Sequence, residues 1–461
     1  MKGKLPGVMA FFLALVGILL SSSTPTDAAT LRPIIFVHGG AGSGAQFESQ
    51  AMRFASNGYP HEYIYVLEYD SSFTLNTYLD VYANLDALIA RVQDETGAEQ
   101  VDILGHSLGT TMMIGGTISD TVTPGYLNSS AERAAKVAHY VNIDGRTAIA
   151  LPGTVVGVPV PTLALWAGRG VPDRAIVGAT NVVVPNQTHV QSASSAESFV
   201  EMYKFFTGRP PRTKEIEPGP HGQVSLAGRA VRFPQNQGVP NASVEIWEVR
   251  GDTGARIGNR PEAVYTLGSD GSWGPFNARA DAYYEMVVRH ASGLNHHFYF
   301  ERFIRSDYLI RLNTEVRGQD PLGGRQDTAD NQSDLIITRY KEFWGDQGAE
   351  NDTLQINGVN VINAATCPIT KRAIGIFVYD AGADGLSDVS APIPFYFGLS
   401  FLTAVDLHVP GAYPPNGTIP IVLTTRGGGG RTQVINVPNW SSTNDRISAT
   451  FNDYLVARPT R

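Results

Sequence analysis

The stretch Val101-Asp102-Ile103-Leu104-Gly105-His106-Ser107-Leu108-Gly109 decides how the first part of this chain folds. An apolar run leads into Gly-x-Ser-x-Gly and then into a segment compatible with a helix, which is the pattern of a strand, a sharp turn and a helix. Flanking glycines are needed because larger side chains would collide with the neighbouring strand or helix. The pattern predicts an exposed Ser107 hydroxyl at the amino end of a helix, where the helix dipole favours a developing negative charge.

Strands and helices alternate on both sides of this stretch, from about residue 30 to residue 208. Apolar residues recur every three or four positions in 79–93 and 196–206, which predicts two helices. The alternation is typical of the α/β class, with a mainly parallel sheet covered by helices on both faces. The expected buried strands are 33–37, 63–67, 101–104, 137–143, 161–168 and 181–184.

Beyond residue 208 the helical pattern stops. Pro- and Gly-rich stretches at 208–211 and 217–220 are typical of a stiff linker, which we place at 209–220. Short alternating strands separated by Gly, Asn and Asp turns then predict a β-sandwich domain at 221–313 and a β-rich, sandwich- or barrel-like domain at 314–461. The aromatic stretch 395–402 is expected in a core, and contact of this region with lipid or polymer is the alternative.

The first 29 residues have the composition of a secretory signal peptide: two lysines, an apolar run at 8–20, and small residues up to Ala28-Ala29. We therefore expect a secreted protein. An uncleaved anchor is the alternative, but this run is short for a span of about 20 residues, and no later segment is apolar for long enough. The formal charge of -8 argues against a nucleic-acid partner. The one cysteine, Cys367, cannot form an internal disulfide and is expected to be a buried thiol.

A serine that accepts an acyl group needs a histidine to move its proton and a carboxylate to orient that histidine. His189 follows the last predicted strand of the α/β region and is the expected histidine. Two aspartates compete for the role of acid. Asp144 directly ends the strand 139–143 and is favoured, whereas Asp173 comes about three residues later than a carboxylate at a strand end should. Asp173 therefore stays as the alternative acid.

The same chemistry needs two N–H donors for the negatively charged oxygen of the intermediate. One is expected from Leu108, directly after the serine, and the other from Gly40 in the glycine-rich loop after the first strand. That loop does not have the Gly-x-Gly-x-x-Gly pattern of a dinucleotide site. The loop 380–388 departs from a calcium-binding pattern at its third and twelfth positions. No cofactor and no metal are expected.

Together, Phe36-Val37-His38-Gly39-Gly40, Gly105-His106-Ser107-Leu108-Gly109 and Thr188-His189 resemble the α/β-hydrolase lipases and esterases over about residues 31–208. The acid after the strand that ends at Ile143 is similar to the arrangement in some lipases. The β-rich C-terminal region resembles that of archaeal lipases with a C-terminal lipid-binding region. The resemblance implies hydrolysis of medium- or long-chain acyl esters, such as triacylglycerols, at an oil–water interface through an acyl-enzyme on Ser107.

Two other functions remain open at this point. The chain could be a depolymerase for polyesters or polyurethanes, with the β-rich domains as polymer anchors, because the same three side chains serve both reactions. It could also be a catalytically silent binding protein built on a hydrolase scaffold. The apolar segment 148–160 could line an acyl pocket, form a mobile flap or be a buried connection.

Overall fold

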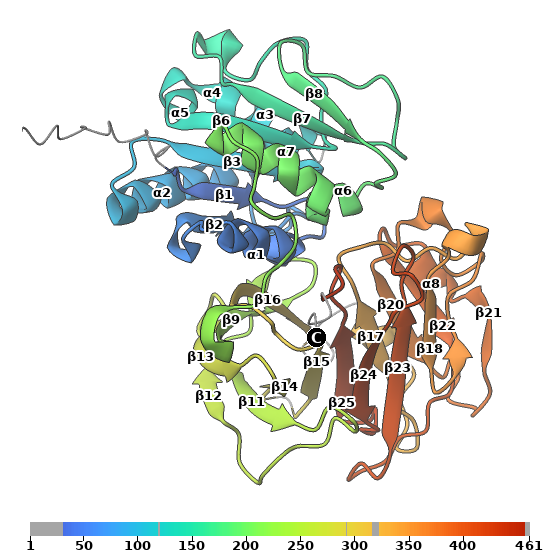
Figure 1. Cartoon of the computed structure of the whole chain (residues 1–461). Helices are drawn as coiled ribbons and strands as arrows, with labels where there is room; N and C mark the ends of the chain where they lie inside the picture. The colour runs from blue at the N-terminus through green and yellow to red at the C-terminus, as the bar shows by residue number, and fades with distance from the viewer. Residues whose placement is uncertain (1–30, 119, 292, 316–321, 457–461) are drawn as a thin grey trace, which may run out of the picture. The chain divides into compact units, whose positions relative to one another are not determined.

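A six-stranded sheet with the strand order β2-β1-β3-β6-β7-β8 organises the N-terminal part of the protein (Figure 1). Every neighbouring pair in it is parallel. The predicted α/β class with a mainly parallel sheet is therefore confirmed. The strands are β1 Ile34–Val37, β2 Ile64–Leu67, β3 Val101–His106, β6 Val137–Ile143, β7 Thr162–Ala167 and β8 Thr180–Val184.

The protein is described from a computed structural model that covers residues 31–118, 120–291, 293–315 and 322–456, without the side chain of His221. The predicted signal peptide at 1–29 lies outside the described residues. None of the described helices is long and apolar enough to cross a lipid bilayer.

Helices cover both faces of the parallel sheet, because the strands are apolar on both sides. On one face, Ile35 and Ile103 belong to a core that includes the apolar residues of α2. On the other face, the ring of Phe36 lies 6.5 Å from that of Phe54 in α1, which in turn contacts Phe199 of α7 at 5.1 Å. The helices are α1 Glu48–Ser56, α2 Tyr78–Thr96, α3 Leu108–Ile114, α4 Tyr126–Ser129, α5 Ala131–Ala135, α6 Gln191–Ser194 and α7 Ala196–Thr207.

Local sequence explains the bounds of the longest helix, α2. The Thr77 side chain accepts the Asp80 backbone N–H, and the Asp80 carboxylate accepts the Thr77 N–H, which together form a capping box. At the other end Gly97 has φ 71°, a left-handed conformation that glycine adopts without strain. The predicted helix at 79–93 is therefore present and extends by about one turn.

The second half of the chain consists mostly of strands, as predicted. A nine-stranded sheet has the order β12-β11-β14-β15-β25-β17-β20-β22-β21, and two four-stranded sheets accompany it. The nine strands are β11 Ser243–Val249, β12 Ala263–Thr266, β14 Tyr283–Arg289, β15 Asn295–Phe300, β17 Leu335–Thr338, β20 Gly375–Tyr379, β21 Asp388–Pro392, β22 Leu402–Asp406 and β25 Asp445–Thr450.

Shorter elements complete the chain. The hairpin β4 Gly116–Ile118 and β5 Thr121–Thr123 follows α3. The four-stranded sheets contain β9 Gln223–Arg232, β10 Gln237–Gly238, β13 Ser272–Arg279 and β16 Asp307–Thr314, and β18 Thr353–Ile356, β19 Val359–Asn360, β23 Thr418–Thr424 and β24 Thr432–Pro438. The remaining helix is α8 Pro394–Phe397, and the 3₁₀ turns are η1 Gly44–Phe47, η2 His61–Tyr63, η3 Thr154–Val156, η4 Pro220–Gly222, η5 Gly323–Arg325, η6 Gly348–Glu350 and η7 Ile369–Lys371.

Strands from both predicted β domains share the nine-stranded sheet. β25, near the end of the chain, pairs in parallel with β15 on one side and with β17 on the other. The nine-stranded sheet thus contains strands from both sides of the predicted domain boundary at 313/314. The boundary itself stays a prediction. Because side chains alternate along a strand, one face of β17 and β25 is a core that contains Leu335, Ile337 and Ile447, and the opposite face carries Ile336, Thr338 and Ser448.

Candidate active site

Ser107 lies in the sharp turn between β3 and α3, as predicted. Its backbone has φ 53° and ψ -118°, a strained conformation for a residue with a side chain. The turn brings α3 very close to β1: a Cβ on Gly109 would lie 2.4 Å from the carbonyl oxygen of Val37. Only glycine permits this approach, so the flanking glycine is a requirement of the packing.

A continuous chain of hydrogen bonds joins Ser107, His189 and Asp144. The Ser107 Oγ lies 2.9 Å from His189 Nε2, and His189 Nδ1 lies 2.6 Å from Asp144 Oδ2. The side chains come from segments that follow β3, β8 and β6, so the carboxyl ends of parallel strands bring them to one edge of the sheet. With Nδ1 donating to the carboxylate, Nε2 is free to accept the serine proton.

The second carboxylate oxygen of Asp144 is also occupied. Oδ1 accepts the Ala167 backbone N–H at 3.1 Å and an Arg174 N–H at 2.7 Å. Burial raises the pKa of Asp144, but the hydrogen bond and charge of His189, with the Ala167 amide and Arg174, outweigh it and lower that pKa to about 2. The carboxylate is therefore ionised across the neutral pH range.

Arg174 was not singled out by the sequence analysis. Its guanidinium lies 4.5 Å from the centre of the Trp166 ring, and it also donates to the Gly145 carbonyl. Stacking on the ring keeps the guanidinium directed at Asp144. Nothing in the local sequence marks Arg174, because its partners lie on other loops.

Asp173, the alternative acid, lies apart from this chain of hydrogen bonds. Its residue is exposed and has φ 57°. Both ring nitrogens of His189 are engaged by Ser107 and Asp144, and the described residues include no hydrogen bond between His189 and Asp173. The structure thus brings Asp144 to His189 and leaves Asp173 on the surface.

The glycine-rich loop after β1 is pinned by its own amides. The Gly39 N–H donates to Gln46, that of Ala41 to the Ser71 hydroxyl, and that of Gly42 to the Gly39 carbonyl. Within the described part of the chain, the Gly40 amide donates no hydrogen bond. The loop also lies against the start of α3, since a Cβ on Gly40 would be 3.9 Å from Leu108 Cδ2.

The Leu108 amide is likewise without an acceptor among the described residues. It belongs to the first residue of α3, and the Ser107 side chain does not cap this helix. Neither of the two amides expected to bind an oxyanion therefore has an acceptor within the described residues, and both belong to segments that line the cavity with Ser107 or directly follow it.

His106, directly before the serine, contacts both the loop that carries His189 and Gln46. Its role was not predicted from the sequence. Its Nε2 lies 2.9 Å from the His189 carbonyl oxygen and its Nδ1 lies 3.0 Å from Gln46 Nε2. Burial, together with the charge of the neighbouring His189, lowers the pKa of His106 to about 3. A neutral ring that donates from Nε2 and accepts at Nδ1 satisfies both contacts.

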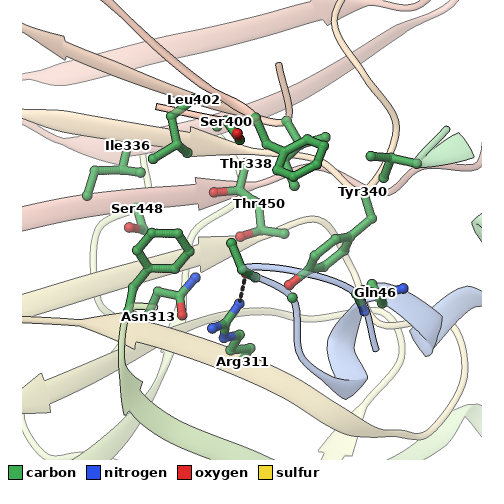
Figure 2. Close-up of a pocket in the computed structure, with 18 of the residues that line it drawn as sticks. Gln46, Arg311, Asn313, Ile336, Thr338, Tyr340, Ser400, Leu402, Ser448 and Thr450 are labelled. Atoms are coloured by element: carbon green, nitrogen blue, oxygen red, sulfur yellow. Dashed lines mark hydrogen bonds between the residues drawn. The ribbon is translucent and has the colours of Figure 1, made fainter. Parts of the chain in front are cut away.

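A cavity of about 130 Å³ opens beside Ser107 and His189. The nine-stranded sheet supplies much of its wall, and Figure 2 shows side chains of β17 and β25 lying next to one another along it. The Phe401 ring is nearly parallel to the His189 imidazole, with 6.4 Å between the ring centres. Residues from this sheet that line the cavity are His296, Phe298, Phe300, Ile336, Thr338, Gly375, Phe377, Leu402, Ser448 and Thr450.

The apolar segment 148–160 does not line this cavity. Ile149 and Val155 are instead 93% and 78% exposed. Part of the aromatic stretch 395–402 does line it, through Ser400, Phe401 and Leu402, whereas Tyr396 is fully buried in a core.

Cys367 is buried, as expected. Among the described residues, no three His, Cys, Asp or Glu side chains are grouped as metal ligands.

Family models match three segments of the sequence. The model described as lipase (class 2) matches residues 31–146, and the lipase C-terminal domain model matches residues 222–317. A third model, described as a C-terminal domain, matches residues 321–455.

Solved structures that match this chain include lipase BlEst2 from Bacillus licheniformis in its propeptide form, which is 10% identical with a TM-score of 0.29 over 90% of this chain and 94% of that chain. A CIB-like hydrolase from Thermoplasma acidophilum is 17% identical over 40% of this chain and 89% of that chain, with a TM-score of 0.27. At TM-scores this low the likenesses carry no weight. Residues 31–146 and 222–317 thus match lipase families, and the parallel sheet of the N-terminal part fits the α/β-hydrolase fold.

Proposed function

We propose that this protein is a secreted serine hydrolase of carboxylic esters, a lipase that cleaves medium- or long-chain acyl esters through an acyl-enzyme on Ser107. One observation carries the proposal: Ser107 and His189, which are joined to Asp144 by a chain of hydrogen bonds, line a largely apolar cavity. The first feature supplies an activated nucleophile and the second a place for an acyl chain.

In the first half of the proposed reaction, Ser107 Oγ attacks the ester carbonyl carbon while His189 Nε2 takes its proton. The carbonyl oxygen becomes negative and is stabilised by the free N–H groups of Gly40 and Leu108. Asp144 stabilises the imidazolium that forms. Collapse of the intermediate breaks the bond to the alcohol, which leaves with the proton from His189.

In the second half, water replaces the alcohol. His189 removes a proton from the water as its oxygen attacks the acyl carbon, and the same two amides stabilise the second tetrahedral intermediate. The carboxylic acid then leaves, and the proton returns from His189 to Ser107. Over the two halves the protons balance, with the ester and one water as the only reactants and His189 as the group that moves each proton.

The cavity wall supports the proposed substrate class. Phe298, Phe377, Leu402 and Ile336 present apolar surface, and burial of each CH₂ group of an acyl chain contributes about 0.8 kcal/mol. Such a wall favours acyl chains that are long enough to reach the sheet. We therefore expect kcat/KM to rise with acyl length from butyrate upward.

A substrate panel tests the proposal. Purified wild type and Ser107→Ala are assayed on p-nitrophenyl esters of increasing chain length, on emulsified triacylglycerols and on polyesters. We expect hydrolysis of the longer esters and triacylglycerols by wild type, no turnover by Ser107→Ala, and labelling of Ser107 by an organophosphonate. Polyester cleavage without triacylglycerol cleavage would identify a depolymerase, and an unlabelled Ser107 would identify a silent binding protein.

Export is the part of the proposal that rests on composition alone. The lysines, apolar run and small residues of 1–29 support a cleaved signal peptide. Mass spectrometry of the N-terminus of protein recovered from the culture medium tests it. A mature chain that begins near residue 29 or 30 is expected, and intact Met1 on protein retained in the cell would contradict it.

A further inference from the structure

The loop that carries His189 is held by a carboxylate from the C-terminal half of the chain. Glu342 Oε1 accepts the Val190 N–H at 2.7 Å, and Glu342 Oε2 accepts the Gln191 N–H at 3.2 Å. These are the two residues that directly follow His189. Glu342 is fully buried and lies between β17 and η6, about 150 residues further along the chain.

Glu342 is itself fixed in place by a buried ionic cluster. Its backbone carbonyl accepts an Arg339 N–H at 2.8 Å and also an N–H of Arg426. Both guanidiniums pair with the buried carboxylate of Asp352, with 2.9 Å between Arg339 Nη2 and Asp352 Oδ2. The Glu342 backbone is thus held by charged groups that the solvent does not screen.

Two more contacts join the same segments. The Ser194 hydroxyl donates to the Tyr340 carbonyl at 2.9 Å, and Arg426 donates to the Gln191 side-chain oxygen at 3.1 Å. Residues 190–194 therefore contact residues 340–342 and 426 at several points. Because several contacts join the segments, we expect them to stay together when Glu342 alone is changed.

On the other side of His189, its carbonyl oxygen accepts hydrogen bonds from His106 Nε2 at 2.9 Å and from the Ser192 hydroxyl at 2.8 Å. The peptide that precedes Val190 is thus anchored through its oxygen by the α/β part and through its N–H by Glu342. Anchors on both ends of one peptide unit leave the His189 Cα little freedom to move.

From this geometry we propose that Glu342 is a positioning residue for His189. The C-terminal half of the chain thereby takes part in catalysis on every ester, including esters too short to reach the cavity wall. This inference rests on the proposed function, because it assigns a partner to the histidine of that reaction. A displacement of about 1 Å at a reacting group can cost about 100-fold in rate. An anchor on the peptide N–H directly after His189 can therefore affect the rate.

The test compares Glu342→Gln and Glu342→Ala with wild type on p-nitrophenyl butyrate. Gln keeps one oxygen acceptor but turns an N–H₂ group toward the second amide, and Ala keeps neither acceptor. We expect kcat to fall by about 10-fold in Glu342→Gln and by about 100-fold in Glu342→Ala, with KM changed by less than about twofold.

Glu301→Gln is the matched control. Glu301 lies in the same half of the chain and accepts one backbone N–H, from Asn452 at 2.8 Å, and one side-chain N–H, from Gln433 at 2.7 Å, all within that half. It should leave kcat unchanged. Circular dichroism and Tm show that each variant is folded, and Glu342→Gln decides the matter if Glu342→Ala does not fold.

A second readout does not depend on turnover. The proton in the short His189 Nδ1–Asp144 hydrogen bond should give a low-field ¹H resonance, and we expect it to broaden or shift in the Glu342 variants and to persist in Glu301→Gln. Unchanged kcat and an unchanged resonance in folded Glu342→Ala would overturn the inference. Full activity of Ser107→Ala would instead overturn the proposed function, which separates the two failures.

Discussion

Asp144 uses its two carboxylate oxygens for different partners. Oδ2 receives the His189 N–H, and Oδ1 receives the Ala167 amide and Arg174. Every one of these partners is a donor, so the site is built for a carboxylate and not for a neutral acid or amide. An uncharged side chain of the same shape would leave a donor facing a donor.

Asp144→Asn and Asp173→Asn therefore have opposite expected outcomes. We expect Asp144→Asn to lose about a thousand- to ten-thousand-fold in kcat, because an amide N–H₂ facing His189 favours the wrong tautomer. Asp173→Asn should keep wild-type turnover, since its carboxylate is on the surface. Assays of the two folded proteins on one soluble ester check this, and the reverse result would reassign the acid.

Glu301 gives a pH dependence of stability. Burial raises its pKa from 4.5 to about 7, against the opposing effect of the Asn452 amide and Gln433. Between pH 4.5 and pH 7 the folded protein keeps a proton on Glu301 that the unfolded chain has released. The contribution of Glu301 to the free energy of unfolding therefore falls as pH rises through this window, by about 3 kcal/mol at most. Urea unfolding of wild type and Glu301→Gln across that window measures it. The same dependence of the free energy of unfolding on pH in both proteins would contradict the prediction.

At the level of elements, the contact between α3 and β1 positions Ser107. The helix begins one residue after the serine, and its second residue, Gly109, lies against the backbone of Val37 and His38. The turn conformation of Ser107 follows from this contact, because α3 can only approach β1 so closely if the chain reverses sharply. The strain at Ser107 is balanced by packing on both elements.

Gly109→Ala should therefore destabilise the protein by about 1–3 kcal/mol and lower kcat, because the added Cβ pushes α3 and Ser107 away from β1. Gly324→Ala is the control: no atom lies within 4 Å of a Cβ built there, and its φ is not in the left-handed region. Urea unfolding of both variants measures the difference. A Gly109→Ala protein as stable and active as wild type would show that this contact can relax.

At the level of the molecule, one cavity is made by parts of the chain that are far apart in sequence. The loop after β1, the turn after β3 and the loop after β8 form one side, and five strands of the nine-stranded sheet form the other. Register determines that second side: Ile336 pairs with both Ser448 and Phe377, and Thr338 with Thr450 and Gly375. Specificity for the acyl chain is thus expected to reside in the C-terminal sheet.

Ile336→Trp should shorten the preferred acyl chain. The larger ring takes up volume in the cavity, so we expect kcat/KM for a palmitate ester to fall at least about 10-fold relative to a butyrate ester. Val264→Trp, on an exposed position of β12 in the same sheet, should leave the ratio unchanged. Both ratios come from p-nitrophenyl esters, and an unchanged ratio in Ile336→Trp would place the acyl chain elsewhere.

Local pattern alone was enough to predict the α/β part. The strand, turn and helix around Ser107, the capped helix α2 and the position of His189 between β8 and α6 all follow from short-range periodicity and turn residues. These features depend on interactions between near neighbours in the chain. Short stretches of sequence are therefore enough to predict them, and the same holds for the β-rich character of the second half.

Tertiary structure decided which side chains meet. The sequence favoured Asp144, at the end of β6, but left Asp173 open, and only the folded chain shows that Asp144 contacts His189. Arg174, Glu342 and the cavity wall on β17 and β25 carry no local signal, since each acts on a partner loop or strand many residues away. Sequence determined the elements and the reactive serine, and long-range packing, which no short window encodes, determined the site around it.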